Sequence, residues 1–351
     1  MTRSLALALA LAPRCLAAAT ALAVATSAAA APLYHFTDLG DHLAYAINAS
    51  GDIVGSGPQG AWRYHQGKFT TLASLGGPNS IAFAINRGGV AAGMSPPGVE
   101  WDHAVIWPAA TPVDLAAAQD PDLQTEAHGI SDAGIVVGSS ARQGVTGQAF
   151  AVHGGTWTWL GLPAGAFNSA LAGINNHGQA VGYADVPFPS GNNYAARAVM
   201  FSQGQWRFLG TISRSKNAES YAQAINDKGQ VTGVSNVATP FGVSHAFLWA
   251  NGHMRDLGAL GDPAVNGSGG LAINASGHVV GHSEVAGASR AFVHDGTAMA
   301  DLNTLVDSVT PGHVLSAAWG INDAGAIVGV TRDGNGASHG FLLTPLGMAA
   351  P

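Results

Sequence analysis

The 351-residue chain contains one cysteine, Cys15, and few charged residues. Cys15 lies near the N-terminus and has no second cysteine to pair with, so burial and backbone pairing must hold the fold without a disulfide. Charged residues make up 10% of the chain, and 21 acidic residues outnumber 14 basic ones, which gives a formal net charge of −7. This balance argues against nucleic acid or an anionic membrane surface as a partner.

The sequence also lacks the motifs of common catalytic and metal sites. It has no Gly-x-Ser-x-Gly, no His-Glu-x-x-His, no phosphate loop ending in Gly-Lys-Ser/Thr and no EF-hand spacing. Three histidines, His103, His245 and His339, occupy the same place in three different repeats, so they are not expected to converge on a metal. We therefore expect no catalytic set, no metal and no cofactor, and a structural hydrogen bond for each histidine within its own repeat.

The only long apolar stretch lies at the N-terminus. It has Arg3 near its start, an apolar run over residues 16–25, and Ala28-Ala29-Ala30 as a cleavage site, which predicts a secretory signal peptide over residues 1–31. A membrane anchor is disfavoured because Arg14 would lie inside it, at a cost of about 2.5–3.5 kcal/mol. We expect a secreted protein, extracellular or periplasmic, with no membrane span in the mature chain.

The chain is rich in glycine, with 48 residues, and it repeats one phrase seven times. The phrase is a small residue, Ile, Asn or Ser, two free positions, Gly, an apolar stretch and a second Gly. Its third position falls at Asn48, Asn86, Ser131, Asn175, Asn226, Asn274 and Asn322. A repeat of about 40–50 residues is one supersecondary unit stacked on its neighbours.

Each repeat is predicted to hold four short strands. In the clearest copy these are residues 221–226, 230–235, 244–249 and 253–257, each bounded by turn residues. Asn226 can open a tight turn through its side-chain oxygen, and Gly229 can take the positive φ that closes it. The residue before the Ile is Ala or Gly in all seven copies, as expected for innermost strands that crowd around an axis.

The two ends of the mature chain indicate how the repeats close. The last repeat ends near Pro345 without a fourth strand, whereas residues 33–40 match the fourth strands of other repeats. An N-terminal strand that completes the last repeat would close a ring and remove an exposed sheet edge. The sequence therefore predicts an all-β fold, with residues 32–351 as a single seven-bladed β-propeller of four-stranded antiparallel blades. A β-solenoid is the alternative.

These phrases resemble the HAF repeat family of extracellular proteins. The best copy runs from Ala224 to Ser235, continues with His245-Ala246-Phe247-Leu248-Trp249 and ends with Asp256-Leu257-Gly258. The resemblance covers nearly all of the mature chain and implies export, but no reaction. Departures include Ser131 for Asn, and Trp159 and Phe208 where the Asp of Asp-Leu-Gly would stand.

Residues that recur in every repeat are interpreted as structural, so a functional set should break the repeat. The second-to-third and fourth-to-first connectors vary most and should lie together on one face of a propeller, where aromatic and amide groups could bind a ligand. An alternative is that these connectors are only tolerated length changes. The candidate ligand-binding residues are Trp101, Asp185, Phe188, Tyr194, Arg214, Glu219 and Phe241.

The sequence thus favours a non-catalytic binding or surface-interaction module whose partner is a polysaccharide or a cell-envelope protein. One alternative is a glycan hydrolase or lyase that uses acids of the loop-rich face, such as Asp185, Glu219 and Glu100. Another is an oligomeric surface layer or matrix component. The sequence leaves the ligand and the oligomeric state open.

Overall fold

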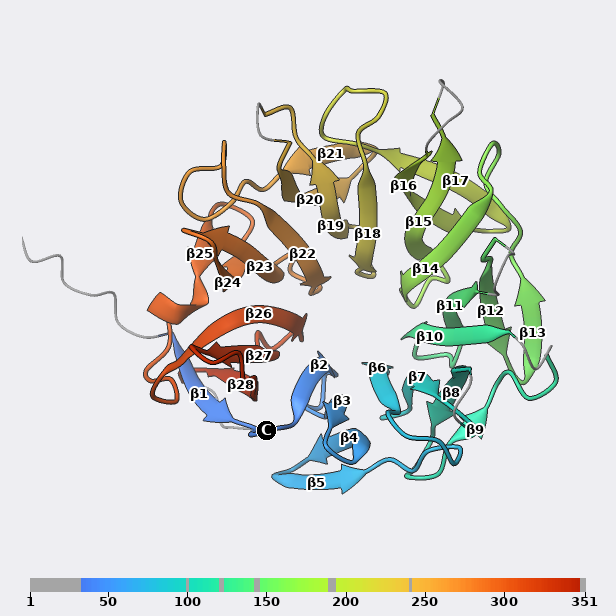
Figure 1. Ribbon diagram of the computed structural model, residues 1–351, viewed down its shortest axis with the longest axis horizontal. Coiled ribbons are helices and arrows are strands. Elements are labelled where there is room, and N and C mark those ends of the chain that lie inside the picture. The colour runs from blue at the N-terminus through green and yellow to red at the C-terminus, as the bar shows by residue number, and fades with distance from the viewer. Residues whose placement is uncertain are drawn as a thin grey trace, which may run out of the picture. The chain divides into compact units, whose positions relative to one another are not determined.

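The chain forms a seven-bladed β-propeller. The computed structural model describes residues 33–98, 101–119, 123–141, 146–188, 194–239 and 242–347, so the predicted signal peptide lies outside the described residues. Within these ranges 28 strands form seven four-stranded antiparallel sheets around a central axis (Figure 1). The one helical element of the described residues is a short 3-10 turn, η1, at Leu302–Thr304.

Six blades use four consecutive strands. Blades 1 to 3 consist of β2 (Leu43–Ile47), β3 (Ile53–Gly57), β4 (Gly60–His65), β5 (Lys68–Thr71); β6 (Ile81–Ile85), β7 (Ala91–Ser95), β8 (His103–Trp107), β9 (Val113–Asp114); and β10 (Gln124–Ile130), β11 (Val136–Ala141), β12 (Ala149–His153), β13 (Thr156–Trp159). Blades 4 to 6 consist of β14 (Asn168–Ile174), β15 (Ala180–Pro187), β16 (Tyr194–Ser202), β17 (Gln205–Gly210); β18 (Ser220–Ile225), β19 (Val231–Asn236), β20 (Ser244–Ala250), β21 (His253–Asp256); and β22 (Ser268–Ile273), β23 (Val279–Val285), β24 (Ala288–His294), β25 (Met299–Asp301). The predicted strands of the clearest repeat match blade 5 to within two residues.

Blade 7 contains strands from both ends of the chain. Its inner strands are β26 (His313–Ile321), β27 (Ile327–Asp333) and β28 (Gly340–Pro345), and its outermost strand is β1 (Tyr34–Asp38). β1 pairs antiparallel with β28 in a register that runs from Tyr34 opposite Pro345 to Asp38 opposite Phe341. In Figure 1 the blue β1 accordingly lies in the red blade.

The repeated Asn forms the inner hairpin turn of each blade as predicted. In blade 5 the Asn226 Oδ1 accepts hydrogen bonds from the backbone N–H groups of Lys228 and Gln230, both at 3.0 Å. Gly229 closes the turn at φ +74°, a conformation that glycine adopts without steric cost.

The small residue before each Ile allows the innermost strands to approach one another closely. A Cβ added to Gly129 would lie 3.1 Å from the Cα of Gly173 in the next blade, and one added to Gly320 would lie 3.3 Å from the Cα of Ala46. The innermost strands therefore meet backbone to backbone, which agrees with the crowding predicted for this position.

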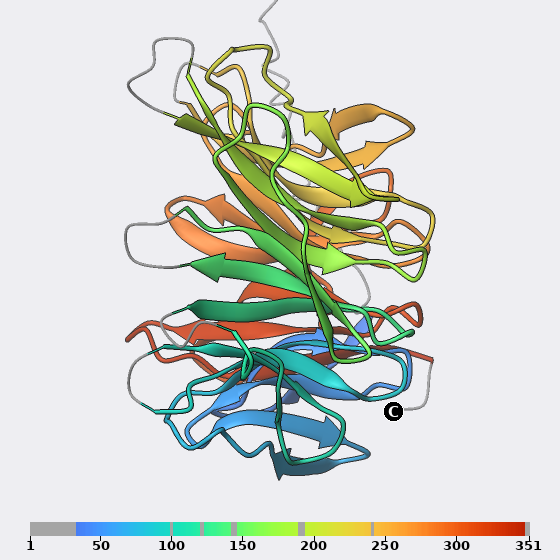
Figure 2. The same cartoon turned by 90° about the vertical axis from the view of Figure 1, so that its right-hand side faces the viewer.

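The core lies between the blades, which pack face to face (Figure 2). Each third strand buries one apolar residue there at the equivalent position of the repeat: Trp62, Val105, Phe150, Val199, Phe247, Phe292 and Phe341. Hydroxyl groups link neighbouring blades as well. At five interfaces a Ser or Thr at the start of the innermost strand accepts the N–H of an Ala in the preceding blade's third strand, for example Ser268 Oγ from Ala246 at 2.8 Å.

The three repeat histidines each form a hydrogen bond within a blade, which confirms the structural interpretation. Nδ1 of His245 lies 2.9 Å from the carboxylate of Asp256 in the fourth strand. The same pairing joins His103 to Asp114 at 2.9 Å and His339 to Asp38 at 3.1 Å. In blade 7 this pair links β28 to the N-terminal strand.

Candidate functional site

Each innermost strand contains a β-bulge at the same place, two residues before the repeated Ile. The register with the second strand shifts there in all seven blades, for example between Ala44 and Ala46. A bulge redirects the side chain of its extra residue. The seven bulge residues are Tyr45, Phe83, His128, Ala172, Gln223, Leu271 and Trp319.

The bulge also explains the second glycine of the repeated phrase. The first strand bends at the bulge, so that the carbonyl oxygen two residues before the bulge residue occupies the position that a Cβ atom would take on the second strand. A Cβ on Gly233 would overlap the carbonyl oxygen of Tyr221, and the same overlap occurs at the equivalent glycine of every blade. The glycine is therefore required by the backbone geometry that turns the bulge residue into the channel.

The seven bulge residues together line a cavity of about 410 Å³ at one end of the channel, which we call the aromatic mouth. Four of their rings form a continuous arc across blades 7, 1, 2 and 3. The ring of Tyr45 lies 5.8 Å from Trp319 and 6.4 Å from Phe83, and Phe83 lies 5.3 Å from His128. Trp319 is 40% exposed, so its ring is available to a ligand.

The direction of the innermost strands places the aromatic mouth on the loop-rich face. Each of these strands runs from a fourth-to-first connector, past its bulge residue, to the repeated Ile and then to the Asn turn. The isoleucines form an apolar ring between the two ends of the channel, since Ile130, Ile174, Ile225 and Ile321 border the cavities on both sides.

Beyond the isoleucines lies the polar mouth, which is lined by the residues of the Asn turns. Each repeated Asn donates from Nδ2 to the backbone carbonyl of the equivalent residue in the next blade. The distances are 3.1 Å from Asn48 to Asn86, 3.0 Å from Asn175 to Asn226, and 3.1 Å from Asn322 back to Asn48. The bonds from Asn86, Asn226 and Asn274 follow the same pattern, and only Ser131 has no such side chain.

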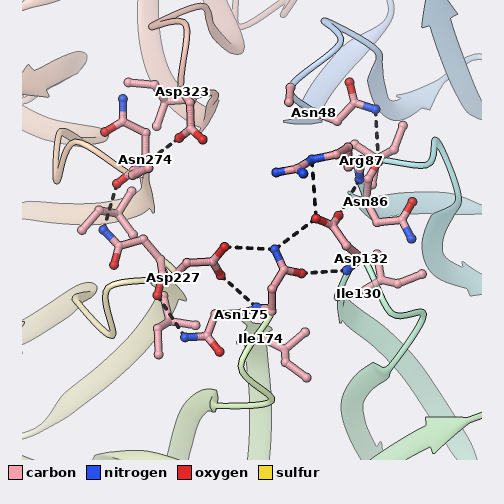
Figure 3. Close-up of a pocket in the computed structure, with 18 residues that line it drawn as sticks. Asn48, Asn86, Arg87, Ile130, Asp132, Ile174, Asn175, Asp227, Asn274 and Asp323 are labelled. Atoms are coloured by element: carbon pink, nitrogen blue, oxygen red, sulfur yellow. Dashed lines mark hydrogen bonds and ion pairs between the residues drawn. The ribbon is translucent and has the colours of Figure 1, made fainter.

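The aspartates of these turns link neighbouring blades instead of closing their own turns. The preceding Asn or Ser already accepts the turn's N–H groups, so Asp132, Asp227 and Asp323 instead bond across to the previous blade (Figure 3). Their Oδ1 atoms accept backbone N–H groups at 2.8–2.9 Å. Within the described residues no group of three or more His, Cys, Asp or Glu side chains could hold a metal ion.

His128 lines the aromatic mouth in blade 3, and Glu126 lies beside it on the same strand. Burial lowers the pKa of His128 to about 4, so the imidazole is neutral at physiological pH. Its Nε2 lies 3.1 Å from Ser139 Oγ and 3.4 Å from Glu126 Oε2. Burial also raises the pKa of Glu126, against the opposing effect of a hydrogen bond from Gln124.

Of the predicted site residues, Asp185, Tyr194 and Glu219 each affect the pKa of one tyrosine, Tyr221 of blade 5. Asp185 is buried and accepts a 2.7 Å hydrogen bond from Asn168 Nδ2. Burial, followed by the charges of Glu219 and Asp185 and smaller effects of Tyr183 and Tyr194, raises the pKa of Tyr221 to about 12. The ring of Tyr221 contacts Tyr183 of blade 4, with ring centroids 5.2 Å apart.

The other predicted residues are not joined to this group by any ring contact or ion pair among the described residues. Trp101 and Phe188 are half-buried in separate connectors, and Arg214 is exposed. Phe241 and Glu100 lie outside the described residues. The sequence analysis missed the bulge residues. Their position could have been noticed, because it holds a different residue in each of the seven repeats, directly before a small-Ile-Asn phrase that is nearly constant.

No protein-family model and no curated protein matches the chain. Solved structures match it in fold. A puromycin-hydrolyzing peptidase of Mycobacterium tuberculosis matches with a TM-score of 0.60 and 12% identity, over 91% of this chain and 56% of that one. The extracellular domain of a B. thetaiotaomicron protein matches with a TM-score of 0.53 and 11% identity, over 88% and 40%. This chain thus spans only about half the length of these proteins, and the likeness shows the β-propeller class alone.

In the described part of the chain, no helix has the length and apolar character needed to cross a membrane.

Proposed function

We propose that the protein is an exported, non-catalytic binding module that holds a sugar unit of a polysaccharide in the aromatic mouth of its channel. Export is supported by the predicted signal peptide and by the resemblance to the HAF repeat family. The ligand site is supported by the geometry of the bulge residues.

One observation carries the proposal. The backbone of the innermost strand is the same in all seven blades, yet the seven bulge positions hold seven different residue types. A purely structural role would favour a repeated residue, as it does for the neighbouring Ile and Asn. Side chains that differ on an invariant backbone are what recognition of an asymmetric ligand requires.

The chemistry of the aromatic mouth suits a sugar ring. Trp319, Tyr45 and Phe83 offer flat apolar faces to the C–H groups of a ring, and stacking on such faces adds to the area that is buried. Across the channel, the Gln223 amide supplies both a donor and an acceptor for hydroxyl groups. The small side chain of Ala172 leaves room on that side of the 410 Å³ cavity.

The test is binding of a polysaccharide and oligosaccharide panel to the mature protein, measured by isothermal titration calorimetry. Trp319→Ala should weaken binding about tenfold or more, because one aromatic face contributes about 1 kcal/mol beyond its buried area. Trp159→Ala is the matched control, since Trp159 is also exposed (43%) but lies on the outer strand β13. Undiminished affinity in Trp319→Ala would exclude the aromatic mouth as the binding site. If the protein captured an envelope protein and no glycan, the ligand would be a protein and the proposed sugar would be wrong.

A hydrolase is the second candidate, because the raised pKa of Glu126 is a property of general acids. Glycoside hydrolysis also needs a second carboxylate about 5–9.5 Å away. This candidate predicts that the protein releases new reducing ends from a bound glycan and that Glu126→Gln abolishes the release. A glycan that is bound and recovered intact would eliminate the hydrolase.

A further inference from the structure

A second cavity lies between blades 5 and 6, on the same loop-rich face as the aromatic mouth. Its volume is about 250 Å³; blade 5 contributes Val234, Val243 and Ser244 to its lining, and blade 6 contributes Gly267, His282 and Glu284. Ser244 begins β20, Gly267 precedes β22 and Glu284 lies near the end of β23, so all three are at the connector end of the blade. The cavity shares no lining residue with the aromatic mouth.

This cavity is open because Gly269, near the start of the innermost strand β22, has no side chain. Gly269 lies opposite His282 of β23, and the equivalent position of blade 5 holds Tyr221. The ring of Tyr221 fills the corresponding space and lies 5.2 Å from the ring of Tyr183 in blade 4. In blade 6 a Cβ on Gly269 would lie 2.8 Å from Cε1 of His282, so the imidazole lies against the bare backbone instead. This pairing of Gly with His occurs in no other blade.

The polar side chains of this cavity can bond to a ligand. Ser244 and His282 are half-buried, and Glu284 is exposed on the same face of β23, two residues beyond His282. Burial lowers the pKa of His282 against the opposing charge of Glu284, so the ring is neutral at pH 7 and offers one donor and one acceptor. Ser244 Oγ accepts a 2.9 Å hydrogen bond from Asn236 Nδ2, which leaves the hydroxyl hydrogen to be donated.

Charge and hydrogen bonding together indicate the ligand. Among the described residues that line the cavity, Glu284 carries the one charge, and none is Lys or Arg. A carboxylate favours a cation, and an ammonium group bonds to it more strongly than a neutral donor does. The neutral imidazole does not repel such a cation. Ser244 and His282 add hydrogen bonds that an amine without hydroxyl groups would leave unused.

We propose that this cavity is a second binding site, which holds one amino-sugar unit with its ammonium group on Glu284. Its volume exceeds that of a cavity of about 150 Å³ that accommodates benzene, so a six-membered ring with its substituents fits. The hydroxyl groups of the sugar bond to His282 and Ser244, and its C–H groups pack on Val234 and Val243. The site is independent of the aromatic mouth and of the function proposed for it.

The experiment is a titration of the ¹⁵N-labelled mature protein with glucosamine at pH 7, followed by NMR through the nitrogens of the histidine rings. His282→Gln identifies the His282 signals as those that it removes. In the wild-type protein these signals should shift saturably, with a Kd on the order of 1 mM. Signals of His282 that do not move with glucosamine would overturn the proposal.

Three further compounds test which part of the sugar is recognised. N-acetylglucosamine and glucose lack the ammonium group and should bind at least about tenfold more weakly. Cyclohexylamine has the amine and a ring of similar size but no hydroxyl groups, and it should also bind more weakly. Equal affinity for the two neutral sugars would refute recognition of the ammonium group, and equal affinity for cyclohexylamine would refute recognition of a sugar.

A variant and its matched control separate this site from its surroundings. Glu284→Gln removes the charge at nearly constant size from an exposed position and should weaken glucosamine binding at least about tenfold. Asp262→Asn removes an equal charge from the exposed connector before β22, outside the cavity lining, and should keep the wild-type affinity. Trp319→Ala should leave the His282 shifts unchanged, so failure at either site is distinguishable from failure at the other. Wild-type affinity in Glu284→Gln, or equal weakening by Asp262→Asn, would show that Glu284 does not hold the ligand.

Discussion

The ring of Asn side chains around the polar mouth should make a measurable contribution to stability, and Asn322 is the best place to measure it. Asn322 joins blade 7 to blade 1 and is buried. Its Oδ1 accepts from Ala326 N at 2.9 Å, and its Nδ2 donates to Asn48 O at 3.1 Å. Asn48 O also accepts from Gly51 N, so Asn322→Ala leaves only the Ala326 N–H without a partner.

The expected cost follows from these two bonds. An orphaned buried N–H costs about 1–3 kcal/mol, and the lost Nδ2 bond adds about 0.5–1.5 kcal/mol. Asn322→Ala should therefore lower the free energy of unfolding by about 2–4 kcal/mol, measured by urea denaturation with coincident fluorescence and circular dichroism transitions.

Ser131→Ala is the matched control. Ser131 Oγ accepts from Ile135 N at 3.1 Å, so this variant also breaks the turn, but it has no bond to the next blade to lose. The difference between the two variants isolates the inter-blade bond at about 0.5–1.5 kcal/mol. Equal destabilisation by both variants would refute the stabilising role of the ring of Asn side chains and leave the turn as the sole reason for the repeated Asn.

Two pH effects should also be measurable. Burial lowers the pKa of His128 from 6.5 to about 4, so on acidification the unfolded chain binds a proton before the folded protein does. The free energy of unfolding should therefore fall by about 3 kcal/mol as the pH drops from 6.5 to 4. His128→Gln should reduce this pH dependence, as measured by urea denaturation at a series of pH values. His245 behaves in the opposite sense: although burial lowers its pKa, the bonds to Asp256 dominate and raise it above 6.5. Its contribution is therefore full below pH 6.5 and is lost as pH rises through the raised pKa, so Asp256→Asn should destabilise more at pH 6 than at pH 9; a constant difference across this range would contradict the ion pair.

The fold could be predicted from the sequence because its determinants are local. A turn that needs Asn at its start and Gly at its end is encoded within four residues, as at Asn226 and Gly229, and seven copies at regular spacing define the blades. The second role of Asn could not be predicted in the same way. Its Nδ2 bonds to a carbonyl in the next blade, 48 residues away for Asn226, and only the three-dimensional closure brings the two together.

The candidate site was predicted only in part for a similar reason. Attention to variable connectors selected Asp185, Tyr194 and Glu219, which all affect the pKa of Tyr221, and their role in ligand binding stays a prediction. The bulge residues were missed because a bulge is a property of strand pairing, and Tyr45 or Trp319 in a short apolar strand has the pattern of an ordinary core residue. The carbonyl that excludes a Cβ from Gly233 becomes visible only once the register is known.

The position of β1 has a consequence for how the molecule is made. Asp38 and Phe341 are partners, yet about 300 residues separate them, so β1 cannot pair until β28 has been synthesised. Until Gly340–Pro345 arrives, no partial product can complete the circle, and closure is expected to be the slow step. The pairing of β1 with β28 therefore couples closure of the ring to the synthesis of its most distant strand.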